Sequence, residues 1–147
     1  MFPDDADVLK VRDAMFDPFE YLMLRHAEQK LRTDFLNGLG KVAHHVPCHL
    51  RVQNIGPKTR EVLSLVPGTE IVTIERCSGH DGTYAVKTEF HDISMKICRP
   101  VADRVAAADA AHYASDCPMA GSQIQNSLER HDRPKHPLTL LRYAYGI

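Results

Sequence analysis

The stretch "PGTEIVTIERCSGHDGTY" (residues 67–84) decides the fold, because it contains a turn, a strand and a cysteine-bearing loop in immediate succession. Its central run "EIVTIE" (70–75) is rich in β-branched residues, which favour a strand. Pro67 and Gly68 form the turn before it, and Cys77 follows its end. Residues 88–109 then show helical periodicity, with apolar residues every three or four positions: Phe90, Ile93, Ile97, Val101 and Val105.

The order of strand, cysteine and helix occurs twice more along the chain. "KVAHHV" (41–46) is a strand candidate that ends at Cys48, and residues 56–66 have helical spacing after it. "AAHYAS" (110–115) is a third strand candidate that ends at Cys117. Helices are expected over residues 118–129 and 136–146. This alternation predicts the α/β class: a short parallel sheet with flanking helices, Rossmann-like βαβαβα, with right-handed crossovers.

The first 40 residues have a different pattern. Residues 4–30 predict two helices, and residues 34–40 predict a glycine-containing loop. We therefore expect a helical N-terminal segment over residues 1–40 and a cysteine-rich domain over residues 41–147. Pro100 lies inside the long helical stretch and predicts a kink or a break there.

Composition excludes several functional classes. The chain has 147 residues and a net charge of −1, without the lysine- and arginine-rich stretches that bind nucleic acid. Its apolar runs are far shorter than the ~20 residues of a transmembrane helix, so any membrane association would be peripheral and through partners. The acidic start "MFPDDADV" is unlike a secretion signal, and we expect a cytoplasmic location.

Three of the four cysteines follow a predicted strand, namely Cys48, Cys77 and Cys117. The carboxyl ends of parallel strands share one edge of a sheet, where ligands bind in α/β folds. We therefore expect the three thiols to converge there. Thiolates are the form that binds zinc, iron or an iron–sulfur cluster. Each cysteine alone is typical of a small buried hydrophobe, but the repetition at three strand ends favours a metal site.

His80 is the best candidate for a further ligand, because Gly79 and Gly82 let the backbone bend close to the site. His45 and His49, which flank the first cysteine, are weaker candidates. Cys98 lies in the middle of the long helix and is expected in the core.

Three motifs resemble the cysteine-rich CCG domain of iron–sulfur oxidoreductases: "PCHLR" (47–51), "CSGHDGTY" (77–84) and "DCPMAG" (116–121). This domain occurs in the cysteine-rich component of heterodisulfide reductase and in the iron–sulfur component of anaerobic glycerol-3-phosphate dehydrogenase. Its pattern is a lone cysteine, then Cys-Cys-Gly, then Cys-x-x-Cys. The resemblance spans residues 41–143, and Gly79 matches the glycine of the Cys-Cys-Gly motif.

The match to the CCG pattern is incomplete. Cys48, Cys77 and Cys117 match family cysteines, whereas Ser78 and Ala120 stand where two further cysteines would be. The family can hold a non-cubane cluster with five thiolates, which three thiolates cannot do in the same way. Three cysteines with a histidine could still hold a cubane cluster, one zinc ion or one mononuclear iron.

The resemblance implies an iron–sulfur electron-transfer domain or subunit of an oxidoreductase complex rather than a complete enzyme. The expected partner is another oxidoreductase subunit or a ferredoxin-like N-terminal part, with this chain as the carboxyl-terminal portion. Two alternatives stay open. One is a structural zinc-binding assembly module without redox activity. The other is a metal-free thiol enzyme in which His80 acts as the base for Cys77.

Overall fold

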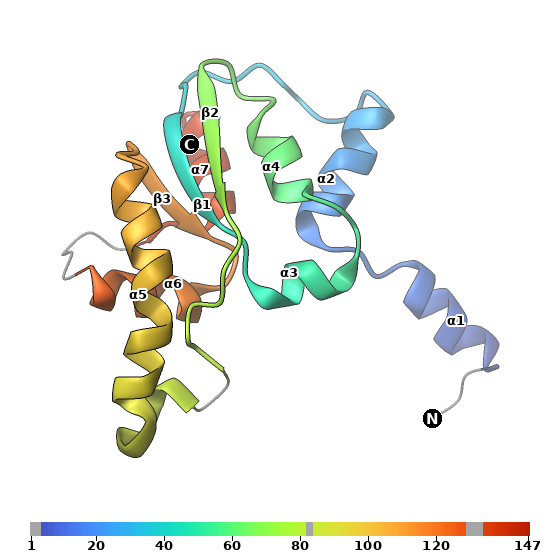
Figure 1. The fold of residues 1–147 in the computed structure, drawn as a ribbon. Coiled ribbons are helices and arrows are strands. Elements are labelled where there is room, and N and C mark those ends of the chain that lie inside the picture. The colour runs from blue at the N-terminus through green and yellow to red at the C-terminus, as the bar shows by residue number, and fades with distance from the viewer. Residues whose placement is uncertain (1–3, 82–83, 129–133) are drawn as a thin grey trace.

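The three predicted strands are present and form one parallel sheet. In the computed structural model, which describes residues 4–81, 84–128 and 134–147, the strands are β1 (Gly40–His45), β2 (Thr69–Ile74) and β3 (His112–Ser115). Their order in the sheet is β2-β1-β3, with both neighbours parallel to β1 (Figure 1). The predicted α/β class with helices around a short parallel sheet is confirmed.

Helices cover both faces of the sheet. One face packs on α2 (Pro18–Ala27), α4 (Lys58–Leu63) and α7 (Pro137–Ala144), and Val42 is the β1 residue in this core. The other packs on α5 (His91–Ala107) and α6 (Pro118–Ser127), with Ala43 as its β1 residue. Because side chains alternate along a strand, His44 faces the α4 side and His45 faces the α5 side. Figure 1 shows α5 and α4 on opposite sides of the sheet.

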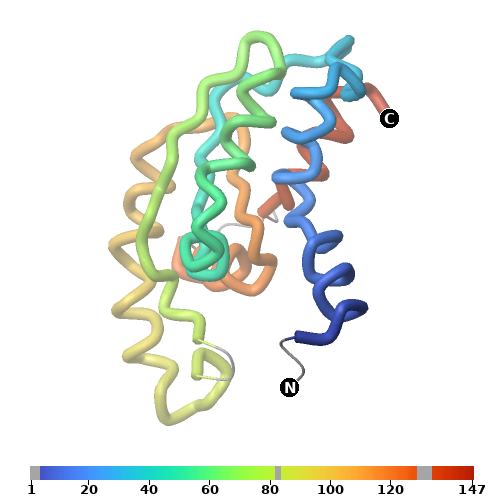
Figure 2. The backbone as a smooth tube through the Cα atoms, turned by 90° about the vertical axis from the view of Figure 1, so that its right-hand side faces the viewer, coloured from blue at the N-terminus to red at the C-terminus, as the bar shows by residue number. Residues whose placement is uncertain are grey.

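The remaining helical elements lie outside these two layers. They are α1 (Ala6–Asp13), α3 (Cys48–Gln53) and the 3-10 turns η1 (Tyr84–Val86) and η2 (Thr88–Phe90). Helix α1 has no buried residue and extends away from the sheet in both backbone views (Figures 1 and 2). None of the helices in the described ranges has the length and apolar character needed to cross a bilayer.

The helix that contains Pro100 does not break. Helix α5 is continuous from His91 to Ala107, so of the predicted kink or break at this proline, the break does not occur. Cys98 and Val101, on either side of Pro100, are fully buried against the sheet. This packing holds both halves of the helix in place despite the missing backbone donor.

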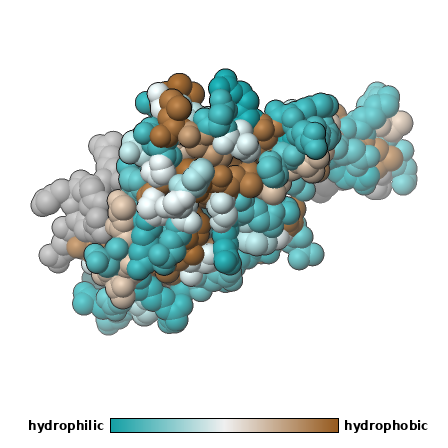
Figure 3. Space-filling model, turned by 90° about the horizontal axis from the view of Figure 1, so that it is seen from above, coloured by the Kyte–Doolittle hydropathy of each residue, from teal (hydrophilic) through white to brown (hydrophobic). Residues whose placement is uncertain are grey.

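The N-terminal helix α2 shares the core of the sheet. Its capping box, formed by Asp17 and Glu20, and Pro18 at its first position fix where it begins. Phe19 is 2% exposed and packs in the same cluster as Leu140 of α7. Seen from above, where the strands begin, hydrophobic residues gather near the middle of the surface and hydrophilic residues surround them (Figure 3).

Candidate metal centre at the carboxyl edge of the sheet

The strand register places the three candidate cysteines at one edge of the sheet. His45 of β1 pairs with Ile74 of β2 and with Ser115 of β3, so these three residues form the last row of the sheet. Cys48 and Cys77 lie three residues beyond this row, and Cys117 lies two residues beyond it. The loops after the three strands leave on the same side of the sheet, as predicted (Figure 1).

Each of these cysteine sulfurs accepts a hydrogen bond. Cys48, the first residue of α3, receives one from Nη2 of Arg51 at 3.2 Å. Cys77 receives one from the backbone N–H of Gly79 at 3.4 Å. Cys117, the N-cap of α6, receives one from the backbone N–H of Ala120 at 3.5 Å. Hydrogen bonds to sulfur are among the features that tune metal centres held by cysteine.

Cys98 has the opposite environment. It is fully buried in the core between α5 and the sheet, as the sequence predicted. Burial raises the pKa of the Cys98 thiol to about 11. This cysteine is therefore a protonated core residue.

The backbone of the Cys77 loop is fixed by a buried polar chain. Ser94 of α5 donates a hydrogen bond to the Gly79 carbonyl at 2.8 Å, and Gln123 of α6 donates to the Ser94 hydroxyl at 2.7 Å. Gly79 has φ +75°, and a β-carbon at this position would overlap the Ser94 carbonyl. Glycine is therefore required two residues after Cys77.

His45 joins two of the cysteine loops instead of acting as a ligand. Its Nε2 lies 2.9 Å from the carbonyl oxygen of Arg76, and its Nδ1 lies 3.0 Å from the Ser115 hydroxyl. Because a carbonyl only accepts, Nε2 carries the proton and Nδ1 accepts from Ser115. The Ser115 hydroxyl in turn accepts from the backbone N–H of Cys117 at 3.3 Å. Burial, as the largest cause, lowers the pKa of His45 and keeps its ring neutral.

The structure does not gather these side chains around one metal ion. Within residues 4–81, 84–128 and 134–147, no three His, Cys, Asp or Glu side chains are grouped so that they could hold an ion. His80 is half-buried, and its Nε2 is buried without a hydrogen-bond partner in the described part of the chain. His49 is exposed. The ligand assignment, including His80, stays a prediction.

The sequence did not predict a buried pair on the other face of the sheet. Nε2 of His44 donates to Oδ2 of Asp116 at 2.6 Å, and the two side chains are only 2% and 5% exposed. The Thr59 hydroxyl donates to the other carboxylate oxygen at 2.8 Å. The two histidines in succession at the end of a strand were the available signal, but their partner lies 72 residues away in sequence.

Together these features define an α/β domain whose carboxyl edge carries three thiols with hydrogen-bonded sulfurs. Comparison with known proteins places it more narrowly. The chain is 33% identical over 105 residues to one of the subunits of anaerobic glycerol-3-phosphate dehydrogenase from Escherichia coli K12, covering 71% of the chain and 26% of that protein. It is 30% identical over 114 residues to one of the subunits of the fumarate reductase (CoM/CoB) from Methanothermobacter marburgensis, covering 72% of the chain and 23% of that protein.

A third relative is an uncharacterized iron–sulfur protein of Methanocaldococcus jannaschii, 34% identical over 92 residues, which are 61% of the chain and 18% of that protein. These homologues confirm the resemblance to the CCG-domain iron–sulfur oxidoreductases. The chain spans about a quarter of the length of the first two relatives. No family model and no solved structure matches it.

Proposed function

We propose that this chain is an iron–sulfur electron-transfer domain of an oxidoreductase subunit. Cys48, Cys77 and Cys117 would hold the cluster, with His80 as the fourth ligand. The observation that carries the proposal is the placement of these three cysteines just beyond one row of the sheet, each with a donor directed at its sulfur. The relatives, one of which is described as an iron–sulfur protein, support an iron–sulfur cofactor and a role in an oxidoreductase.

The donor set suits a cluster with four ligands. Iron–sulfur clusters are held by thiolates, and histidine replaces cysteine in some of them. The chain offers four candidate ligands. Three are cysteine sulfurs that accept hydrogen bonds, and the fourth is a half-buried histidine whose Nε2 has no partner in the described residues. The set does not fit a five-thiolate cluster, because Ser78 and Ala120 occupy the two remaining family positions.

When bound, the cluster would accept and release single electrons. The chain itself would set the energetics of that exchange through its donors to sulfur. With a cluster bound, the guanidinium of Arg51 and the N–H groups of Gly79 and Ala120 would stabilise negative charge on the three sulfurs. Hydrogen bonds to cluster sulfurs are among the factors that set reduction potential. His45 would hold the Cys77 and Cys117 loops at a fixed separation.

Neither alternative from the sequence has comparable support. A tetrahedral zinc ion binds sulfur at about 2.3 Å, so its ligands must lie within about 4 Å of one another. The described residues contain no preformed group of three ligands, which bears equally on zinc and on a cluster, and the relative described as an iron–sulfur protein favours the cluster. A thiol enzyme would need His80 in contact with Cys77. No hydrogen bond joins these two side chains in the described part of the structure, and the Cys77 sulfur instead accepts from Gly79.

The proposal also concerns what surrounds the domain. Because the chain corresponds to about a quarter of its relatives, we propose that it works with a partner oxidoreductase subunit or a ferredoxin-like part, in the cytoplasm. Such a partner would supply or remove the electrons.

Anaerobic purification followed by iron, acid-labile sulfide and zinc analysis tests the proposed function. We expect iron and sulfide with visible absorption in the wild type, their loss in Cys77→Ala and Cys117→Ala, and their retention in Cys98→Ala. A colourless protein with stoichiometric zinc would instead support the structural module. Iron retained in both ligand variants would contradict the ligand assignment.

A further inference from the structure

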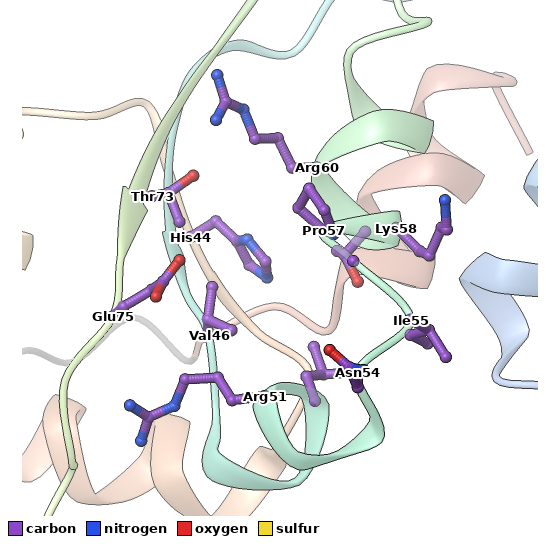
Figure 4. Close-up of a pocket in the computed structure, with 13 residues that line it drawn as sticks. His44, Val46, Arg51, Asn54, Ile55, Pro57, Lys58, Arg60, Thr73 and Glu75 are labelled. Carbon is purple, nitrogen blue, oxygen red and sulfur yellow. The ribbon is translucent and has the colours of Figure 1, made fainter.

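A cavity of about 320 Å³ lies on the α4 face of the sheet, between β1, β2 and the α3–α4 segment (Figure 4). No part of the proposed electron-transfer function needs it. Its walls combine charged, polar and apolar residues, which is the usual composition of a small-molecule site. Three features of these walls indicate what would bind there.

The first feature is a buried histidine nitrogen without a partner. His44 is 2% exposed, and Asp116 holds its ring through Nε2. The ring points from β1 toward α4 and lines the cavity (Figure 4). Its Nδ1 has no hydrogen-bond partner in the described part of the structure, and the hydroxyl of Thr73 on the same wall also has none. Buried polar atoms are nearly always hydrogen-bonded, so these two mark a place for a polar ligand.

The second feature is an excess of positive charge. Arg51 and Arg60 both line the cavity, and within residues 4–81, 84–128 and 134–147 neither pairs with a carboxylate, although Arg51 donates to the Cys48 sulfur. Lys58 also lines it but pairs with Glu61 at 2.9 Å, outside the lining. Glu75 is the one acidic residue among the described residues of the lining. Two guanidinium groups against one carboxylate favour an anion, and guanidinium binds carboxylates with two parallel hydrogen bonds.

The third feature is an apolar wall, formed by Val46, Leu50, Ile55 and Pro57. A simple inorganic anion would leave this wall in contact with water, whereas an organic anion would cover it. We propose that the cavity binds a small organic carboxylate with an apolar body and a hydroxyl group. The carboxylate would contact Arg60, while Arg51, whose guanidinium lies at the opposite end of the cavity, would add positive charge at longer range (Figure 4). The hydroxyl would donate to Nδ1 of His44, which accepts because Nε2 carries the proton toward Asp116.

The cavity and the candidate metal centre share one residue. Arg51 lines the cavity and also donates to the sulfur of Cys48 at 3.2 Å. The cavity therefore borders one of the proposed cluster ligands through Arg51. The cavity itself consists of side chains of this chain alone, so its binding can be measured on protein with and without metal.

Four probes of similar size or charge test the proposal by NMR titration of ¹⁵N-labelled protein. They are 3-hydroxybenzoate, benzoate, 3-hydroxybenzamide and inorganic phosphate. We expect amide shifts confined to residues 44–60 and 73–75, with affinity falling in the order 3-hydroxybenzoate, benzoate, 3-hydroxybenzamide. Phosphate should bind more weakly than benzoate.

Variants assign the interaction to named side chains. Arg60 is exposed, so Arg60→Gln should keep the fold and weaken 3-hydroxybenzoate binding by about tenfold, the loss of one charge-assisted contact. Arg104→Gln, an exposed arginine on α5, is the matched control and should bind as the wild type does. Glu75→Gln should strengthen binding, because it removes the opposing carboxylate.

His44→Gln should abolish the preference for the hydroxylated probe. Because His44 is buried, the binding result for this variant counts only if its NMR spectrum shows a folded protein. If it does not fold, Arg60→Gln alone tests the proposal. Three outcomes would overturn the proposal: equal binding of the amide and the acid, phosphate binding at least as tight as benzoate, or wild-type affinity in Arg60→Gln. Shifts confined to other parts of the chain would overturn it as well.

Discussion

Gly79 and Ser94 are in direct contact, and this contact holds the Cys77 loop on helix α5. The Ser94 hydroxyl donates to the Gly79 carbonyl at 2.8 Å, while the Ser94 carbonyl occupies the space where a β-carbon of residue 79 would be. The backbone position of Gly79, in the loop after β2, thus depends on the turn of α5 that contains Ser94.

Gly79→Ala should therefore lower the free energy of unfolding by more than about 2 kcal/mol, since it adds overlap to an unfavourable φ. Gly68→Ala is the control, because Gly68 has φ +69° but no atom within 4 Å of the added β-carbon. This second change should cost only about 1 kcal/mol. Urea unfolding measures both, and equal losses would show that the contact with Ser94 contributes nothing.

The two positions where family cysteines are missing give a second prediction. Ser78 and Ala120 are 5% and 4% exposed, next to Cys77 and close to Cys117 in sequence. Cysteine is a small residue that tolerates burial. The double variant Ser78→Cys/Ala120→Cys should therefore fold and bind more iron per chain than the wild type after anaerobic reconstitution. Ser64→Cys, an exposed position at the end of α4, controls for an added thiol. Unchanged iron content in the double variant would contradict the assigned site.

Thiol reactivity separates the four cysteines in metal-free protein. Cys48 and Cys77 are exposed, Cys117 is intermediate and Cys98 is buried. With the pKa of Cys98 at about 11, about one molecule in a thousand would carry a thiolate there at pH 8. Iodoacetamide should therefore modify Cys48 and Cys77 first, and Cys98 only after unfolding, as followed by peptide mass spectrometry. Modification of Cys98 at the rate of Cys48 in folded protein would refute this order.

Acidification should weaken the fold through His45. Its folded pKa lies below the ordinary histidine value of 6.5, mainly because of burial, so the unfolded state binds more protons as the pH falls below that value. The stability from the neutral ring is complete above about pH 6.5 and is lost as the pH falls toward the lower folded value. His112 has a pKa lowered by burial and contributes in the same direction.

Urea unfolding at pH 7.5 and pH 5 measures this dependence. His45→Gln should reduce the difference between the two pH values, whereas His49→Gln, which changes an exposed ring, should leave it unchanged. A difference of the same size in His45→Gln and the wild type would assign the pH dependence to other groups.

The strands and most helices could be predicted from sequence because their signals are local. The strand expected over residues 70–75 is β2 at 69–74, and the helix expected over residues 118–129 is α6 at 118–127. Pro100 predicted a kink or a break, and no break occurs because burial of its neighbours on α5 outweighs the missing donor. Helix α3 was not predicted, since its six residues contain no buried side chain and therefore show no periodic pattern.

The candidate site was predictable only in part. The cysteines could be placed at one edge because each follows its own strand. The pairing of His44 with Asp116 could not be predicted from the sequence, because it joins residues 72 positions apart and depends on the β1–β3 register. The role of His45 as a link between loops, rather than a ligand, likewise depends on the backbone carbonyl that its ring contacts.

The position of β1 at the centre of the sheet has a consequence for how the mature protein is made. Each of the three proposed cysteine ligands follows a different strand, so their loops reach the same edge of the sheet only after β2 and β3 have both docked on β1. These pairings are distant in sequence and form slowly compared with local helices. Under the proposed function, a nascent or partly folded chain would offer iron one cysteine at a time, and cofactor loading would be a late event that only correctly assembled chains complete.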